Sequence, residues 1–431
     1  MRLAPAVATS LPPPIAADSL WLFLLQVGVL LTLALLLGRL AVRFHLPPLV
    51  GELLAGIVLG PSVLGAAAPS FTSWLFPPDA QQAHLLDSVA QIGVVLLVGL
   101  TGFSLDLGQL RRQIKPAVGV SVGGVLVPVG SGVLTGYLLP ASVVPAGVDR
   151  VVFALFVGVA MGVSAIPVIA KTLTDMGLVH TRVGRLILTA GVFDDAIGWL
   201  LLSIVSAMAV TGVHPGLVLL SLGQLAGFLL AAALVARPLV RLALNRANRS
   251  SGPGPVIVTV AAVVLLGAAA GQALRLEAVF GAFVAGVVVG SCPGFDRTRL
   301  EPLRIMVISV LAPLFLATVG LRVTLADLMD GSTPAVAAVV LVIAVASKFG
   351  GGYAGGRAGG LGHWDALSVG AGLNARGVVG IIVASVGRSL GLLTPGMYAT
   401  VLLLAITTSL MAPVVLRWTT RRAGTRLAPV G

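Results

Sequence analysis

Long apolar runs recur along the whole chain, separated by short polar segments. We count thirteen, each roughly 17 to 25 residues long, the length that an α-helix needs to cross the hydrocarbon core of a bilayer. They are 20–42, 47–66, 85–105, 114–138, 150–173, 184–209, 216–236, 254–273, 276–292, 304–321, 334–354, 365–387 and 396–417. Of the 431 residues, 57% are hydrophobic and only 10% are charged, whereas a soluble domain has about 25% charged residues. The sequence therefore predicts an all-α polytopic membrane protein with about thirteen transmembrane helices.

The distribution of basic residues predicts the orientation. With thirteen spans, most Lys and Arg residues fall in loops on the same side of the membrane, which the positive-inside rule makes the cytoplasm. The N-terminal segment 1–19 is then expected outside the cell membrane, and the tail 418–431 in the cytoplasm. The net charge of +12 lies in these short loops, so it indicates topology rather than a nucleic-acid partner. The preference for Arg over Lys, with abundant Gly, Ala and Val, favours a bacterial source.

Thirteen spans divide as six, one and six. An odd linker span makes the two sets of six enter the membrane in opposite directions, which is the inverted-repeat plan of many secondary transporters. The sequence has no GxxxxGK[ST] phosphate loop, and only a short tail follows the last span, so we expect no nucleotide-binding domain and no ATP-driven pump. The single cysteine, Cys292, leaves no internal disulfide framework.

Among the ionisable side chains inside predicted spans, where each costs a few kcal/mol unless it has a partner or a function, five stand out: Glu52, Asp194, Asp195, Lys348 and Arg376. The two aspartates lie about ten residues into the sixth span, in GVFDDAIGW, which at about 1.5 Å per residue is close to mid-bilayer. Neighbouring helical positions differ by about 100°, so the two are not expected to share a proton. A carboxylate withdrawn from water takes up either a proton or a cation, which is the chemistry of an antiporter. The structural alternative is a buried acid paired for packing or assembly.

The other three charges have different explanations. Lys348 stands out in a chain that prefers arginine, because a desolvated ammonium can lose its proton and a guanidinium cannot. We expect it to pair with an aspartate until a cation binds; alternatively it extends to the cytoplasmic interface. Arg376 needs a partner, with Glu52, Asp194 and carbonyls of a broken helix as candidates, and a structural ion pair stands beside a transport role. For Glu52, near the start of the second span, the structural interpretation is favoured.

Two spans have helix breakers near mid-bilayer. The fifth, MGVSAIPVIAKTL, contains Gly162, Ser164 and Pro167, and the twelfth has Gly370, Gly372, Gly377 and Gly380 around Asn374 and Arg376. A proline removes a backbone donor and leaves a carbonyl free. Breaks in corresponding spans of two inverted halves indicate a binding site, because freed carbonyls and half-helix ends can hold or steer ions.

Taken together and in order, these motifs resemble the cation:proton antiporter-2 family of the monovalent cation:proton antiporter superfamily. That family includes sodium/proton exchangers and Kef-type potassium/proton exchangers. The resemblance runs from about Leu20 to Arg417. The segments that carry it are GELLAGIVLGPSVLG, LVGLTGFSLDLGQLRR, GVSAIPVIAKTLTDMGL, GVFDDAIGW, EAVFGAFVAG, APLFLATVGLRVTL, ASKFGGGYAGG and GLNARGVVGIIVA.

The resemblance implies a core bundle of six helices in which the two interrupted spans cross at the site. It also implies that this core moves against a scaffold by an elevator-like motion and that the scaffold forms a homodimer. It assigns 20–105 and 254–321 to scaffold and dimerisation, 114–209 and 334–417 to the transport core, and 216–236 to a linker helix. Asp195 matches the acid that binds the proton or the transported cation, and Asp194 matches the acid that pairs with the lysine at position 348. Ser164 matches the polar position in the fifth-span break, and Arg376 matches the arginine of the twelfth-span motif.

Two departures from the family pattern bear on the mechanism. Many relatives have Glu directly after the RG of the twelfth span, but here Val378 follows Gly377, which leaves the partner of Arg376 open. Kef-type members usually have a non-acidic residue before the transport aspartate and a cytoplasmic nucleotide-binding domain. This chain has Asp194 there and no such domain is expected. It therefore resembles the aspartate-pair exchangers more, a subgroup associated with sodium and with electrogenic exchange.

The sequence thus predicts a secondary antiporter that exchanges Na⁺ or K⁺ for H⁺ by alternating access, not an enzyme, with no cofactor. Asp195 and Asp194 would hold the transported cation, with Lys348 beside them and Ser164, Asn374, Arg376 and Glu52 in support. A proton-coupled transporter of an organic solute is the alternative, but it would not need FDD and a buried lysine. An intramembrane aspartyl protease is disfavoured, because its two aspartates must come from different helices to flank a water molecule.

Overall fold

The computed structural model describes residues 17–44, 46–103, 114–166, 169, 172–173, 176–178, 181–212, 215–250, 252–274, 276–292, 296–331 and 333–422. Pro167, one of the predicted helix breakers, lies outside these residues. So do most of the predicted external segment 1–19 and most of the predicted tail 418–431.

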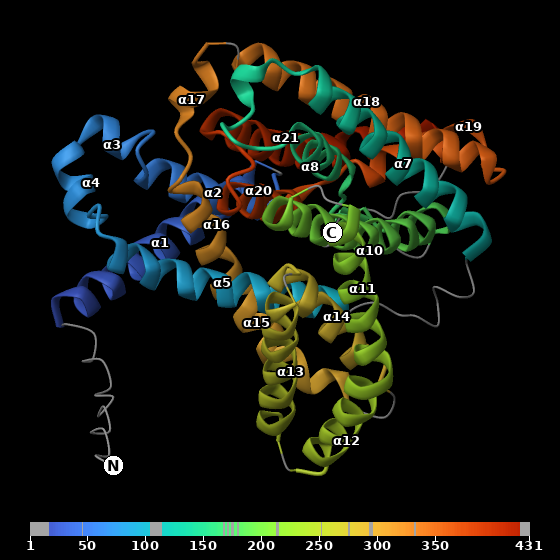
Figure 1. Ribbon diagram of the computed structural model, residues 1–431, viewed down its shortest axis with the longest axis horizontal. Helices are drawn as coiled ribbons and strands as arrows, with labels where there is room; N and C mark the ends of the chain where they lie inside the picture. The colour runs from blue at the N-terminus through green and yellow to red at the C-terminus, as the bar shows by residue number, and fades with distance from the viewer. Residues whose placement is uncertain are drawn as a thin grey trace, which may run out of the picture.

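Helices make up the fold, and no strand occurs in the described ranges. The α-helices are α1 (Ala17–Arg43), α2 (Pro48–Leu59), α3 (Leu64–Ala67), α4 (Pro69–Leu75), α5 (Ala80–Phe103), α7 (Ile114–Leu138), α8 (Arg150–Gly162), α10 (Arg182–Thr211), α11 (Pro215–Ala231), α12 (Arg237–Asn248), α13 (Gly254–Ala273), α14 (Ala278–Gly290), α15 (Glu301–Met306), α16 (Ala312–Gly320), α17 (Leu325–Met329), α18 (Thr333–Ala358), α19 (His363–Leu373), α20 (Gly377–Ser389) and α21 (Pro395–Arg422) (Figure 1). The predicted all-α membrane fold is therefore confirmed.

The exact number of spans is not confirmed. In the described part of the chain, 10 helices are long and apolar enough to cross a membrane, or up to 11 if the bent pair α19 and α20 forms one span. The predicted spans 150–173 and 276–292 correspond to the shorter apolar helices α8 and α14. In the predicted span 150–173, regular helix stops at Gly162, close to the predicted break.

The helices pack as two bundles. We call α7, α8, α10, α18, α19, α20 and α21 the site bundle, and α1, α2, α5, α13, α14 and α16 the flanking bundle, because the main contacts run within each set. In Figure 1, α7, α18 and α19 lie together at upper right, and α1 and α2 lie at the left. The bundles meet where α10 contacts α14 and where α16 contacts α20. Each bundle thus combines segments from both halves of the chain.

Very small side chains allow the closest helix contact in the site bundle, between α7 and α18. An added Cβ on Gly351 would overlap the carbonyl of Gly123, and one on Gly123 would overlap the carbonyl of Gly351. In lipid such close backbone approach is a main source of helix association, because apolar side chains gain little by leaving hydrocarbon. This contact places Lys348, one turn before Gly351, against α7.

The linker helix differs from the prediction in length. It was expected to end at residue 236, but α11 continues through a π-helical turn (Ala232–Ala236) into α12, which ends at Asn248. Pro238 follows that turn, and Pro313 follows the π-helical turn Val307–Leu311. Proline clashes with the carbonyl four residues earlier, and a wider turn relieves the clash without ending the helix. The hydropathy signal stopped at 236 because the continuation is polar.

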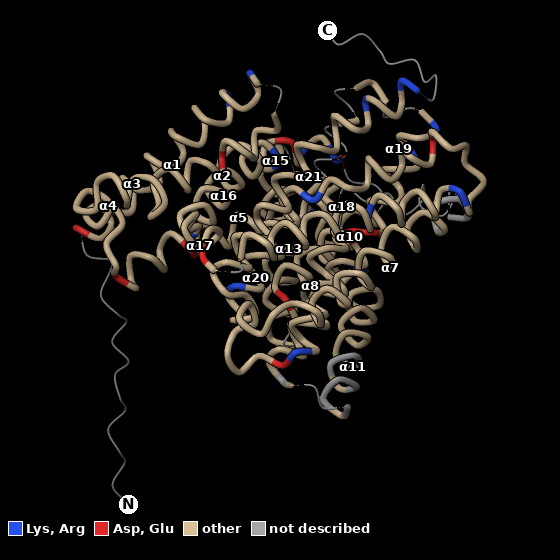
Figure 2. Tube along the Cα trace, turned by 90° about the horizontal axis from the view of Figure 1, so that it is seen from above, with Lys and Arg blue, Asp and Glu red and all other residues tan. Residues whose placement is uncertain are grey.

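Charge is sparse throughout the fold. Figure 2 shows long stretches of the trace without a charged residue. Many of the outward-facing side chains are large and apolar, among them Leu24, Leu126, Leu234, Val342 and Val414. This surface fits a lipid environment, in agreement with the predicted membrane class.

We predict that Gly351→Ala destabilises the protein and that Gly350→Ala does not. The added methyl group of Gly351→Ala forces α7 and α18 apart, which should cost about 1–3 kcal/mol. At Gly350 a Cβ meets no atom within 4 Å, so the only effect of Gly350→Ala is the higher helix propensity of alanine. Thermal unfolding of the two purified variants in detergent measures their stabilities. Equal melting temperatures for the two variants would contradict the close-packing interpretation.

Candidate functional site

Two interrupted helices lie against each other in the site bundle. Helix α8 ends at Gly162, and residues 163–165 are not helical. Helices α19 and α20 are separated by a short break and bent by 44°. The amide of Ala165 in the first break donates a 2.8 Å hydrogen bond to the carbonyl of Ala375 in the second. The two breaks expected from the sequence therefore meet at one point.

Glycine is needed at two positions of the second break. Gly377 has φ = +47°, which L-residues rarely adopt, and its amide donates to the Ser409 hydroxyl at 3.0 Å. At Gly372 a Cβ would lie 2.7 Å from the side chain of Ile187 on α10. These glycines let the chain turn sharply while α19 stays close to the helix that carries the aspartates.

Lys348 of α18 is fully buried and all three of its ammonium protons have acceptors. Its Nζ donates to Asp194 Oδ2 at 2.7 Å, to the Gly124 carbonyl at 2.8 Å and to the Gly162 carbonyl at 2.5 Å. Of the two sequence alternatives, the side chain therefore forms an ion pair with an aspartate instead of extending to the interface. A buried ion pair is stable only when its remaining hydrogen-bonding groups are satisfied, and here two backbone carbonyls complete the ammonium.

The adjacent aspartates have different surroundings. Asp194 Oδ2 accepts from Lys348 and, at 2.9 Å, from the Ser164 hydroxyl. Asp195 is 0% exposed, and the backbone amide of Ile166 lies near its carboxyl group without forming a hydrogen bond of normal geometry; no other described residue donates to its oxygens. The 100° step between helical neighbours accounts for this difference. A buried carboxylate without a counter-charge is very costly.

Ser164 connects the ion pair to the second break. Its Oγ lies 2.9 Å from Asp194 Oδ2 and 2.8 Å from the carbonyl oxygen of Leu373, the last residue of α19. A hydroxyl group has one proton, and both of these neighbours can act as acceptors. When the hydroxyl donates to the carboxylate, the Leu373 carbonyl has one donor fewer; when it turns to Leu373, Asp194 loses a hydrogen bond.

Arg376 is held by carbonyl groups and not by a carboxylate. Its Nη2 donates to the carbonyls of Met161 at 2.6 Å and Ala344 at 2.9 Å, and its Nη1 donates to Asn374 Oδ1 at 2.9 Å. Of the three candidate partners of Arg376, the carbonyls bind it. Among the described residues, neither Glu52 nor Asp194 forms a hydrogen bond with it. The last carbonyls of a helix lack intrahelical partners and carry the negative end of its dipole. Arg376 and Lys348 together neutralise the end of α8.

Of the two remaining candidate residues, Asn374 belongs to the site and Glu52 does not. Asn374 is buried in the break and contacts Arg376. Glu52 lies on α2 of the flanking bundle, beside Gly38 of α1, and no hydrogen bond joins it to the site residues in the described ranges. The structure thus brings Asp194, Asp195, Lys348, Ser164, Asn374 and Arg376 together and leaves Glu52 apart.

Sequence reasoning expected carbonyls of a broken helix to take part but did not identify the acceptors, which are the carbonyls of Gly124, Met161, Gly162, Ala344 and Leu373. For two of them a signal existed, since Gly162 and Leu373 end half-helices. Gly124 belongs to a glycine pair in α7, where small residues permit close approach.

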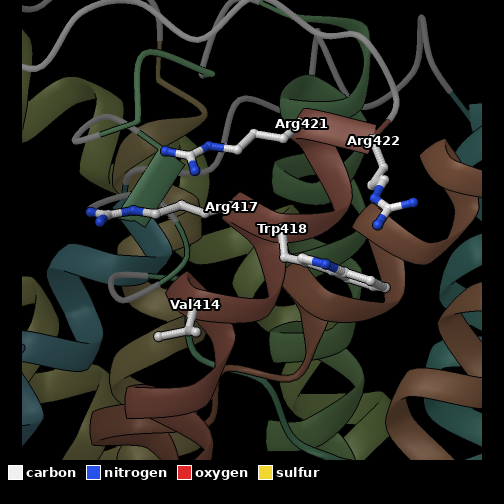
Figure 3. Close-up of a pocket in the computed structure, with 5 residues that line it drawn as sticks. All are labelled: Val414, Arg417, Trp418, Arg421 and Arg422. Carbon is white, nitrogen blue, oxygen red and sulfur yellow. The ribbon is translucent and has the colours of Figure 1, made fainter.

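A surface hollow of about 610 Å³ lies elsewhere, at the C-terminal end of α21 (Figure 3). Val414, Arg417, Trp418, Arg421 and Arg422 line it. The Arg422 guanidinium lies 5.8 Å from the Trp418 ring centroid. Aromatic and basic residues at a helix end are typical of a membrane–water interface, so we do not assign this hollow to the carboxylate site.

Comparison with known proteins identifies the family. The family model for the transmembrane part of sodium/hydrogen exchangers matches residues 28–422. The chain is 30% identical over 406 residues to the Na⁺/H⁺ antiporter NhaS4 of Synechocystis sp., covering 93% of this chain and 98% of that protein. It is 28% identical over 397 residues to Cation/H⁺ antiporter 17 of Arabidopsis thaliana, covering 92% of this chain but 48% of that protein, so it spans about half of that relative's length. Its fold is similar to that of the sodium proton antiporter MjNhaP1 of Methanocaldococcus jannaschii, with a TM-score of 0.61, 15% identity and coverage of 94% and 97%.

The chain belongs to the sodium/hydrogen exchanger family, which confirms the family that the sequence motifs resemble. It is a membrane transporter of the cation/proton antiporter class and not an enzyme.

We predict that Ser164→Ala changes the pH dependence of exchange, because the Asp194 carboxylate loses one of its hydrogen bonds, and a hydrogen bond to a charged group is worth about 1.5 kcal/mol. Ser164→Thr keeps the hydroxyl and should restore the wild-type profile. Exchange measured across pH in proteoliposomes decides this; an unchanged profile in Ser164→Ala with a lower melting temperature would mean that Ser164 only stabilises the fold.

Proposed function

We propose that this protein exchanges Na⁺ or K⁺ for H⁺ across the cell membrane by alternating access, with the proton and the cation competing for Asp195. The observation that carries the proposal is the complete burial of an Asp195 carboxyl group that has no charged partner and no hydrogen bond of normal geometry among the described residues. It lies next to an aspartate that is already paired with a lysine. Relatives named as Na⁺/H⁺ and cation/H⁺ antiporters support the same activity.

The competition follows from electrostatics. An isolated carboxylate in a medium of low dielectric constant is unstable, and either a proton or a monovalent cation neutralises it. Both cannot occupy it together, so release of one permits uptake of the other. Exchange at a single group therefore couples the two fluxes without a separate energy source.

The Asp194–Lys348 pair supplies a second exchangeable charge. If the entering cation also contacts Asp194, the ammonium loses its only carboxylate partner, and a desolvated ammonium without a partner can release a proton. The cycle would then move two protons for each monovalent cation and carry net charge. The carbonyls of Gly124 and Gly162 would hold the neutral amine in place.

The two bundles suggest how the site reaches both sides of the membrane. In the proposal the site bundle moves, carrying the crossed breaks and the aspartates. The flanking bundle is the scaffold and contains the surface for a homodimer. The N-terminus lies outside and the C-terminus in the cytoplasm, as the positive-inside rule predicts.

The test is exchange by purified protein in proteoliposomes, with Na⁺, K⁺ and Li⁺ in turn, at several pH values and with a voltage-sensitive readout. Proton movement that depends on a monovalent cation is expected, and the reversal voltage gives the number of protons per cation. Absence of cation-dependent proton movement in all three salts would overturn the proposal.

We predict that Asp195→Asn abolishes exchange and leaves the protein folded. The amide has the same shape as the neutral carboxyl group, but it carries no negative charge with which to bind a proton or a cation. Asp330→Asn, an exposed acid before α18, is the control and should keep wild-type exchange. Proteoliposome exchange and thermal unfolding measure the two effects. Full activity in Asp195→Asn would refute its assigned role.

Lys348→Ala is expected to change the charge moved per cation and the pH profile, because the exchangeable ammonium is lost. Lys348→Arg retains the positive charge but cannot release a proton, so it separates pairing from proton transfer. The reversal voltage and the pH dependence of exchange distinguish the variants. A wild-type voltage and profile in Lys348→Ala would count against the second exchangeable charge.

A further inference from the structure

One face of α10 carries a stripe of buried polar side chains that begins at the site. Asp195, Trp199, Ser203 and Ser206 are each 0–2% exposed. At about 100° per residue, these four positions fall within an arc of about 80° and extend over about 16 Å along the helix. The stripe therefore leads from the mid-membrane carboxyl group toward the C-terminal end of α10.

Among the described residues, the polar atoms of this stripe have no hydrogen bond of normal geometry: both oxygens of Asp195, near which the backbone amide of Ile166 lies, the indole nitrogen of Trp199 and the hydroxyls of Ser203 and Ser206. Buried polar groups are nearly always paired. Hydroxyl groups on other helices of this protein usually donate to a carbonyl one turn earlier, as Thr400 donates to Gly396. Ser203 and Ser206 make no such bond in the described part of the chain.

The stripe lies at the contact between the two bundles. The Trp199 ring centroid is 6.5 Å from that of Phe283 on α14, in the flanking bundle. At the far end, the Ser206 hydroxyl lies against the partly buried carboxylate of Glu277, the residue before α14, without a hydrogen bond of normal geometry. A carboxyl group thus stands at each end, with hydroxyl and indole groups between them.

We propose that this stripe is the hydrated path by which monovalent cations and protons travel between Asp195 and the membrane face at the C-terminal end of α10, with Glu277 at its entrance. This inference rests on the proposed function and names its route. A carboxylate at the mouth concentrates cations and repels anions. The serine hydroxyls can donate to water and accept from it, or contact a cation, whereas the indole only donates. Since the path runs where two bundles meet, displacement of one bundle against the other opens and closes it.

Cysteine accessibility tests the path. Cys292 is the only cysteine, so Cys292→Ser provides a cysteine-free background whose exchange is measured first. Ser203→Cys is introduced into it, with Ile204→Cys, about 100° away on the same turn, as the matched control. The probe is Ag⁺, a thiol-reactive monovalent cation small enough to follow a transported one. It is added on the side where α10 ends, and residual thiol is titrated after unfolding.

Ser203→Cys is expected to react at least tenfold faster than Ile204→Cys and to lose exchange as it reacts. Equal rates, or an unreactive Ser203→Cys in vesicles that still exchange cations for protons, would overturn the path and leave the proposed function standing. If the unmodified background protein does not exchange, the proposed function and the path fail together.

Glu277→Gln gives an independent measurement. Loss of the entrance charge should raise the KM for the cation several-fold at low ionic strength while kcat stays unchanged, and the difference should fade at high salt. Glu277→Asp should restore the wild-type KM. A KM that is unchanged at low salt, or a change in kcat alone, would exclude Glu277 as the entrance.

Discussion

The ammonium group of Lys348 joins three helices at the centre of the site bundle. It bonds to the Gly124 carbonyl of α7, the Gly162 carbonyl at the end of α8 and the Asp194 carboxylate of α10. A lysine in the middle of an apolar helix is tolerated only with such a full set of acceptors. The geometry of α7, α8 and α10 is therefore tied to one charge, and any change in that charge acts on all three helices.

The broken helix α8 makes this arrangement possible. A continuous helix would use its own carbonyls, whereas the end at Gly162 frees several of them. Lys348 and Arg376 occupy two adjacent ones, and the Ala165–Ala375 hydrogen bond holds the second break against the first. The result is a region where backbone polarity, and not solvent, compensates buried positive charge. One carboxylate oxygen of Asp194 accepts from Lys348 and Ser164 within that region, whereas Asp195, at the next position of α10, has no charged partner in the described residues.

This asymmetry also explains why the polar stripe of α10 begins at Asp195. Asp194 faces the interior of the site bundle, where protein groups supply its partners. The following residues on the Asp195 face reach the boundary with α14. A single step along one helix thus separates a paired aspartate from the neighbour to which the proposed mechanism assigns exchange. Rigid packing through Gly123 and Gly351 fixes the first environment, and the boundary between bundles leaves the second able to change.

Local signals in the sequence were sufficient for the membrane class, the helices, the buried charges and the two breaks, because hydropathy, glycine and proline act within a few residues of where they stand. These signals predicted the limits of α7, α13 and α21 to within a few residues. They placed the end of the linker helix at 236, because α12, which continues it, has a polar sequence that lowers the mean hydropathy. The sequence motifs pointed to the Asp194–Lys348 pair and offered broken-helix carbonyls as candidates for Arg376, but which carbonyls bind Lys348 and Arg376 came only from the tertiary structure. Every residue has a carbonyl group, and which of them are free and near a given side chain depends on where helices end and how closely they cross. Likewise, Asp194 and Asp195 are the same residue type in the same span, and packing against different neighbours gives them their different environments.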